Sequence, residues 1–172
     1  MKLKPMTASL YEKIQKKIKN RQDISDLIDG VDIRNVDLSR AIIKNFNRPN
    51  GDISNVNLSY AIIGEEGKQI NFAGCKMRHV NFHGAKFLGK LILRGADLRF
   101  SDLSEAFIPY VVYQRADLRG CKFCGIVFKL GSLEGLKAKF DSQFFVDLAR
   151  AWDIDLVKIM EVFENKEEDK ND

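Results

Sequence analysis

The sequence predicts an all-β solenoid with helical flanks. Three observations lead to this fold class. A period of five residues runs through the middle of the chain, the central position of each unit is apolar in 17 of 19 units, and the last position is glycine or asparagine in 10 of 19. A helix needs apolar residues about every 3.6 positions and a flat strand every second one, so neither explains this period. Glycine and asparagine accept the positive φ of tight turns, so each unit is expected to be a short extended piece followed by a corner.

Residues 1–30 are predicted to form an N-terminal helical cap that covers the first coil. Leu10, Ile14 and Ile18 recur every fourth residue, and Thr7 stands where a helix N-cap is expected. A second short apolar set, residues 24–28, leads to the first repeat unit. The basic residues between positions 13 and 21 are interpreted as the solvated face of this cap.

Residues 31–130 are predicted to form the repeat region. Units occupy 31–65, 70–89 and 91–130, with residues 66–69 and Lys90 left over as insertions. We number the positions of each unit from i−2 to i+2, with i the central residue. Arg48 and Tyr113 are the two exceptions at position i, and burying an unpaired guanidinium is costly. A local bulge is therefore expected to turn Arg48 outward, and residues 64–69 are expected to protrude as a loop.

Several units match A(D/N)LxX, the motif of the pentapeptide-repeat family: ADLRF at 96–100, ADLRG at 116–120, VDLSR at 36–40 and SDLSE at 101–105. The chain resembles this family over roughly 100 of its 172 residues. The resemblance implies a right-handed quadrilateral β-helix, in which four units make one coil and side chains i and i−2 fill the interior. Nineteen units then give about five coils. Because one coil cannot bury its own apolar residues, stacking of coils has to do so.

Every fourth unit should share one side of such a coil. The first side then shows a stripe of aspartates at i−1 beside a stripe of arginines at i+1, and the second side is polar. The candidate interaction residues of the charged face are Arg34, Arg78, Arg99 and Arg119. On the third and fourth sides the outward residues are largely apolar. This candidate strip consists of Ile42, Ile62, Leu88, Ile92, Phe107, Tyr110, Val112 and Val127. Soluble monomers rarely leave such patches bare, so the strip is predicted to be covered by this chain's own helix or by another chain.

Residues 131–164 are predicted to be a C-terminal helical element, and residues 165–172 a disordered tail. An apolar stripe at helical spacing supports one helix over 142–164, or two helices divided near Asp153 and Asp155. This element is expected to cap the last coil, to lie on the third side or to pair with a second copy, and family members that dimerise through C-terminal elements give the last option a precedent. The candidate cap or dimer residues are Phe145, Leu148, Trp152, Leu156, Ile159 and Phe163.

No catalytic site, metal site or cofactor is predicted. The two histidines, His79 and His83, fall at outward positions on different sides, away from any nucleophile or ligand set. Cys121-x-x-Cys124 has the spacing of a metal or redox pair, but the five-residue register sends Cys121 inward and Cys124 outward. Three cysteines do not make a disulfide framework, and the chain has neither a signal-like segment nor an apolar run of membrane-spanning length. A cytoplasmic protein without a membrane partner is expected.

The predicted function is that of a non-catalytic protein-interaction or scaffold module that binds through an outer face of the β-helix. The partner stays open, and so does a homodimer through the C-terminal helix or the apolar strip. One alternative follows from the resemblance: the best-known family members are acidic, DNA-like rods that bind type II topoisomerases such as DNA gyrase and confer quinolone resistance. Residues 31–130, however, carry a net charge of +6. The other alternative is a nucleic-acid binder that uses the arginine stripe.

Overall fold

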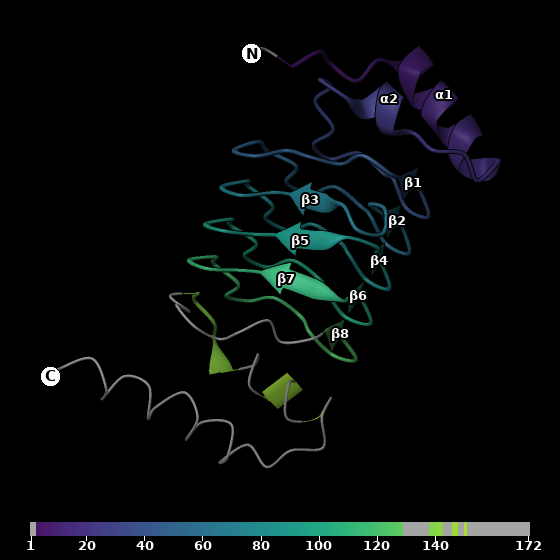
Figure 1. Ribbon diagram of the computed structural model, residues 1–172. Helices are drawn as coiled ribbons and strands as arrows, with labels where there is room; N and C mark the ends of the chain where they lie inside the picture. Colours follow the sequence, from purple (N-terminus) through teal and green to yellow (C-terminus); the bar gives the residue numbers. More distant parts are fainter. Residues whose placement is uncertain (1–2, 129–137, 143–145, 148–149, 151–172) are drawn as a thin grey trace, which may run out of the picture.

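The computed structural model describes residues 3–128, 138–142, 146–147 and 150. In it, two helices lie at the N-terminal end and the chain then winds through a column of stacked coils (Figure 1). Helix α1 spans Ala8–Lys19 and helix α2 spans Ser25–Ile28. The Thr7 hydroxyl accepts a hydrogen bond from the Leu10 amide at 3.2 Å, as expected of an N-cap.

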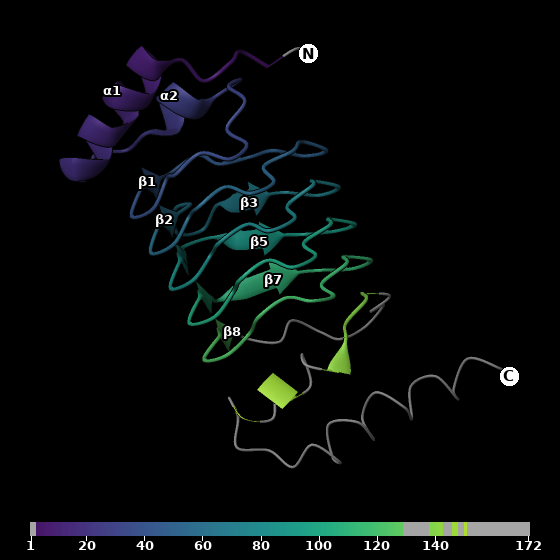
Figure 2. The same cartoon turned by 180° about the vertical axis from the view of Figure 1, so that it is seen from behind.

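Helix α1 joins the core of the coil through one apolar face. Its Ile14 is fully buried in the same cluster as Ile28 and the interior residues of the first coils. The Gln15 side-chain amide adds a polar contact, donating to the Asp37 carbonyl oxygen at 2.9 Å. The two opposite views place both helices over the N-terminal end of the column (Figures 1 and 2).

Two parallel sheets line adjacent sides of the column. The third side holds five strands, which pair in chain order: β1 (Ile42–Ile43), β2 (Ile62–Ile63), β4 (Lys86–Phe87), β6 (Phe107–Ile108) and β8 (Val127–Phe128). The fourth side holds three: β3 (Gln69–Asn71), β5 (Lys90–Ile92) and β7 (Tyr110–Val112). The first and second sides pair through single residues, at positions i−1 of the repeat.

The pairing register confirms the predicted sorting of units by side. On the third side, Ile42 pairs with Ile62, Ile62 with Lys86, Lys86 with Phe107 and Phe107 with Val127. Steps of four five-residue units occur at both ends of this series. The two longer steps contain the insertions at 66–69 and near Lys90. The insertions therefore loop out without changing which side each later unit occupies.

The buried side chains of the column are those at positions i and i−2 of the repeat, as predicted. Every described central residue from Ile33 to Phe123 is buried except Arg48, and the exceptional Tyr113 is 8% exposed. Most i−2 residues are buried beside them. Pairs of phenylalanines help to fill the width of the column. Phe46 and Phe72 lie edge to face with ring centroids 5.0 Å apart, a favourable geometry for aromatic rings.

The corners explain the glycine and asparagine at position i+2. On the first, second and fourth sides this residue has positive φ, including non-glycine residues such as Tyr60 (φ 57°) and Phe100 (φ 63°). The corner after the third side differs. There Gly89 and Tyr110 lack positive φ, and the chain passes directly into the strands of the fourth side. The positive φ that favours glycine and asparagine therefore occurs at three corners of four.

The prediction that Arg48 turns outward is wrong. Its side chain is partly buried, and its guanidinium donates to the carbonyl oxygens of Val31, at 3.1 Å, and of Ile28. Burial lowers the pKa of this guanidinium. The first coil has no coil above it on this side, so one carbonyl at the end of α2 and one at the start of the first repeat unit accept the donors that an interior position would leave unpaired.

The repeat extends past residue 130, where the sequence analysis ended it. Lys139 pairs in parallel with Asp117, and the Leu118 amide donates to the Lys139 carbonyl at 2.8 Å. Phe140 lies edge to face with Tyr113, with 6.0 Å between ring centroids. Residues 138–140 thus form a further unit on the first side, and they read Ala-Lys-Phe, as residues 85–87 do.

Two carboxylates complete the hydrogen bonding at this end. In the body of the column, an amide such as that of Phe100 donates to a carbonyl one coil further on, here that of Arg119 at 3.1 Å. In the last coil the Gly120 amide donates to the Asp141 carboxylate, and the Phe123 amide donates to Asp147 Oδ2 at 3.2 Å. Side-chain oxygens here take the place of the next coil's carbonyls.

Candidate functional site

The arginine stripe of the first side is neutralised by its own aspartates. Each arginine lies within ion-pair distance of an aspartate in its own coil, which we also call a level of the column, or in the next coil. The pairs are Arg34–Asp32 at 2.6 Å, Arg78–Asp97 at 2.6 Å, Arg99–Asp97 at 2.9 Å and Arg119–Asp117 at 2.7 Å. Side-chain hydrogen bonds from the arginines lower the pKa of Asp32 and of Asp117. These ion pairs leave the four guanidinium groups with little uncompensated charge to offer to a phosphate.

The second side and its corners carry aromatic and histidine contacts. Tyr60 Oη and His83 Nε2 are 2.9 Å apart, and Glu105 approaches the same nitrogen at 3.8 Å. His79 stacks on Phe100 at the neighbouring corner, with 5.2 Å between ring centroids. The two histidines lie in separate contacts, as predicted. In the described part of the chain, no group of three or more metal-ligating side chains comes together.

The cysteines follow the predicted register. Cys121 is buried and Cys124 is exposed, so the pair does not form a joint site. Burial raises the pKa of the Cys121 thiol and that of the Cys75 thiol to about 12. Both are core residues at position i−2, and Cys124 is an outward residue of the second side.

The apolar strip lies on the outside of the third and fourth sides. Leu88 and Phe107 are each 42% exposed, Val127 is 56% exposed and Tyr110 is 58% exposed. The remaining four members are partly exposed: Ile42, Ile62, Ile92 and Val112. Strand pairing places members of the strip next to each other in successive coils: Ile42 pairs with Ile62, Ile92 with Val112, and Phe107 with Val127. The structure therefore brings together residues that are up to 85 positions apart in the sequence.

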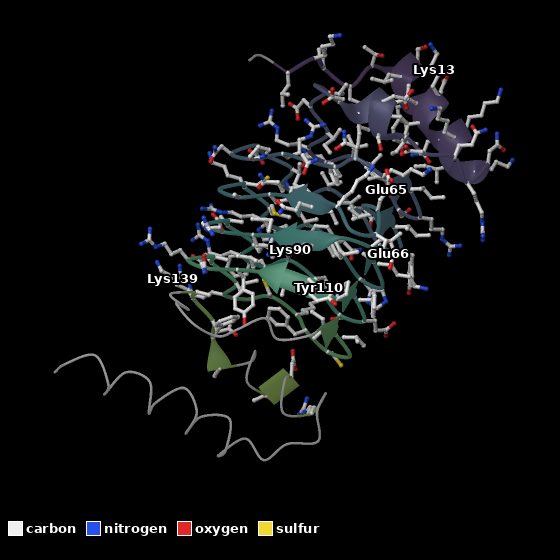
Figure 3. The ribbon with its side chains drawn as sticks, in the orientation of Figure 1. Lys13, Glu65, Glu66, Lys90, Tyr110 and Lys139 are labelled. Atoms are coloured by element: carbon white, nitrogen blue, oxygen red, sulfur yellow. The ribbon has the colours of Figure 1, made fainter. Side chains whose placement is uncertain are left out.

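The cations around the strip differ from those of the first side. Between residues 85 and 115, the outward residues of the third and fourth sides include Lys86, Lys90, Arg94 and Arg115 and no acid. None of the four has a carboxylate within ion-pair distance among the described residues. Lys90 and Tyr110 are seen next to each other on this side in Figure 3. Four cations of the coil without an ion pair among the described residues therefore lie around the apolar strip, while Lys76 and Arg40, on the first and second sides, are two others.

The insertion at residues 64–69 forms a compact loop at the corner of the same two sides. Lys68 and Glu65 form an ion pair at 3.0 Å, and the Lys68 amide donates to the Glu65 carbonyl at 3.1 Å. The Lys68 carbonyl in turn accepts from the Lys90 amide at 2.9 Å. Glu65 lies toward the N-terminal end of this corner, and Glu66 lies at about the height of Lys90 (Figure 3).

A hollow of about 570 Å³ between the helices and the first coil escaped the sequence analysis. Its wall includes Lys17, Asp26, Asn47 and Arg48. Their polar groups are engaged with the protein itself: Lys17 Nζ lies 3.0 Å from Asp26 Oδ1, and Asn47 Oδ1 accepts from a backbone amide at 2.7 Å. The sequence signal was Arg48 at an inward position, which a repeat unit does not explain.

The predicted C-terminal cap or dimer residues, Phe145, Leu148, Trp152, Leu156, Ile159 and Phe163, lie outside the described residues. Among those described, no helix has both the length and the apolar character needed to cross a bilayer.

No family model and no curated protein matches this chain. Solved structures do. A pentapeptide repeat protein from Nostoc Pcc 7120 is 21% identical over 82% of this chain and 100% of its own, with a TM-score of 0.33. One from the thylakoid lumen of Arabidopsis thaliana is 22% identical over 70% of this chain and 75% of its own, with a TM-score of 0.35.

QnrB1, a plasmid-mediated fluoroquinolone resistance protein, is 15% identical over 76% of this chain and 83% of its own, with a TM-score of 0.23. These are distant likenesses, and the evidence for the fold remains the chain's own register of paired units. In its five-residue motif and in the four-sided coil which that motif builds, this chain has the features of a pentapeptide-repeat protein.

Proposed function

We propose that this chain is a non-catalytic interaction module that binds a protein partner through the apolar strip of its third and fourth sides. In this proposal the coil is a right-handed quadrilateral β-helix of about five coils, closed by an N-terminal helical cap, and it acts as a rigid scaffold in the cytoplasm. The observation that carries the proposal is the contrast between sides. The arginines of the first side are paired with aspartates, whereas no described residue covers the exposed apolar side chains of the strip.

The physical argument rests on the exposed apolar area. Phe107, Tyr110, Val127 and Leu88 each leave about half of their surface in water. Phe107 pairs in register with Val127, and Leu88 and Tyr110 lie at the corner between the third and fourth sides. Apolar surface stabilises a complex by roughly 25 cal/mol per Å² removed from water. A rigid parallel sheet loses little conformational entropy when its side chains are covered, because its backbone is already fixed.

The test compares two matched pairs of substitutions. Phe107→Asp with Tyr110→Asp places charge within the strip. Phe100→Asp with Tyr60→Asp changes the same residue types at corners of the other two sides, where they are 58% and 51% exposed. The strip variant is expected to lose concentration-dependent self-association in light scattering, or to lose capture of a partner that is then identified and titrated in pure form. The control variant should retain it.

The proposal fails if the strip variant keeps the oligomeric state and every captured partner of the wild type. Circular dichroism and thermal melting of both variants establish that the fold is intact, so that a loss of binding is not a loss of structure.

The two alternatives lack a comparable observation. A topoisomerase-directed function of the quinolone-resistance type suits a negative, DNA-like rod, whereas residues 31–130 carry a net charge of +6. An unchanged gyrase supercoiling assay at micromolar protein would count against it. Nucleic-acid binding through the arginine stripe requires free guanidinium groups, and a mobility-shift series without strong salt dependence would exclude it.

A further inference from the structure

The charges and aromatic rings of the strip form a repeated pattern. Lys86 of β4 pairs in register with Phe107 of β6, and Lys90 of β5 pairs with Tyr110 of β7. Each lysine therefore lies one level N-terminal to an exposed aromatic residue, on two adjacent sides that meet at one corner. Neither lysine has a carboxylate within ion-pair distance in the described part of the chain, and neither lies over an aromatic ring.

From this pattern, and building on the proposed function, we infer that the partner presents an acidic amphipathic helix to the strip. Its carboxylates would meet Lys86 and Lys90, and its apolar side chains, one turn further along, would meet Phe107 and Tyr110. Opposite charge at an interface selects the partner and its orientation more than it adds affinity. The direction of the pattern, with the lysines N-terminal to the aromatic rings on both sides, would fix which way the helix lies.

The spacing of the levels suits a helix. Successive levels of a parallel stack are about 4.8 Å apart, and successive turns of a helix are about 5.4 Å apart. A helix that lies along the column therefore presents one apolar residue per level through its i, i+3, i+4 and i+7 positions. The densest part of the strip, from Leu88 to Val127, covers three coils. The two spacings between these coils add up to about 10 Å, which is about two helical turns.

An anionic membrane would also meet an apolar and cationic surface, and the neighbouring acids decide against it. Glu65 and Glu66 lie at the same corner as Lys90, Glu65 toward the N-terminal end and Glu66 at about the height of Lys90 (Figure 3). Lys68 is the ion-pair partner of Glu65. A flat anionic bilayer would cover both carboxylates and be repelled, whereas a single helix along the strip can pass beside them.

The probe is a synthetic helical peptide with leucines at i, i+3, i+4 and i+7 and glutamates elsewhere, titrated by fluorescence anisotropy against the full chain. A peptide with lysines in place of the glutamates serves as its counterpart. The test variant is Lys86→Glu with Lys90→Glu. The matched control is Lys76→Glu with Lys122→Glu, which makes the same change of charge at outward positions of the first and second sides.

The wild type is expected to bind the glutamate peptide in preference to the lysine peptide, with affinity that falls as salt is added. The test variant should weaken binding of the glutamate peptide about ten-fold, whereas the control should change it less than about two-fold.

Three results would overturn the inference. Equal binding of both peptides, unchanged in the test variant, would mean that apolar contact alone operates. Loss of flotation with phosphatidylserine vesicles in the test variant, without binding of either peptide, would assign the strip to a membrane surface. Absence of all binding by a folded wild type would exclude a helix of this chemistry. The proposed function is judged separately, by Phe107→Asp with Tyr110→Asp, so the two can fail independently.

Discussion

Gly89 is the position where the packing of the 64–69 loop can be tested most directly. A Cβ at Gly89 would lie 2.3 Å from the Lys68 carbonyl oxygen and 3.0 Å from that of Glu65. Both contacts are with backbone atoms, so no side-chain rotation relieves them. Gly95 provides the contrast, because its φ is +65° and a Cβ there would meet nothing within 4 Å. Gly89→Ala therefore tests steric fit, and Gly95→Ala tests backbone conformation.

The expected free energies of unfolding follow from these contacts. Gly95→Ala should lower the free energy of unfolding by about 1 kcal/mol. A left-handed backbone conformation destabilises alanine by roughly 1–2 kcal/mol, and the smaller conformational entropy of the unfolded alanine variant offsets about 0.4–1 kcal/mol of this loss. Gly89→Ala should cost about 2–3 kcal/mol. Overpacking contributes about 1–3 kcal/mol. Displacement of the Lys68 carbonyl from the Lys90 amide, now 2.9 Å away, contributes about 1 kcal/mol more.

Urea unfolding followed by circular dichroism measures both values, with the m-value as the check that the transition is comparable between variants. Gly84→Ala adds a third case. Its Cβ would lie 2.5 Å from the exposed Tyr60 ring, which can rotate away, so its cost should stay near that of Gly95→Ala. A Gly89→Ala variant that is no less stable than Gly95→Ala would refute the assignment of the loop to a packed corner.

Three further predictions concern the last coil, its acid stability and its thiols. Phe140→Ala should lower the free energy of unfolding by about 2 kcal/mol, measured by urea titration, because the ring completes the core beyond residue 130. Asp117 has a lowered pKa in the folded protein, so its contribution is present above the ordinary aspartate pKa of about 3.9 and is lost as pH falls through the folded value. Asp117→Asn should therefore flatten the loss of stability between about pH 5 and pH 2. An aromatic disulfide reagent should label Cys124 quickly in the native protein and the buried Cys75 and Cys121 only on unfolding.

The first two of these predictions have matched controls, and the third has a refuting outcome. Phe100→Ala removes a ring that is 58% exposed and should cost less than about 1 kcal/mol, so an equal loss for Phe140→Ala and Phe100→Ala would contradict the added unit. Ser54→Ala changes an outward residue of the first side and should leave the loss of stability at low pH as it is in the wild type. Fast labelling of more than one thiol in the native protein would contradict the inward register of the other two.

The interior and the four sides were predictable because they follow from a single local rule. With Arg48 as the exception, a residue at position i is buried and a residue at i−1 faces out, so Leu98 and Asp97 are placed by their sequence position alone. The exposure of Phe107 and the pairing of Arg119 with Asp117 follow from the same rule. Periodicity carries this information because each coil repeats the geometry of the previous one.

The failures lie where a coil has no neighbour. Arg48 stays inside because the carbonyls of Ile28 and Val31 lie above it at the N-terminal end. Phe140 joins the core because the last coil needs a cover, and the spacing of its unit from the previous one departs from five-residue steps. Neither arrangement repeats along the chain, so the five-residue period does not predict it.

The sequence alone thus determined the coil and its inward and outward residues, because these depend on a five-residue rule that nearly every unit obeys independently. The tertiary structure decided which charges remain unbalanced and where they lie. Lys86 and Lys90 acquire their place next to Phe107 and Tyr110 only through pairing between strands about 20 residues apart. Electrostatic balance depends on distances across coils, and such distances are a property of the stacked structure and not of any one unit.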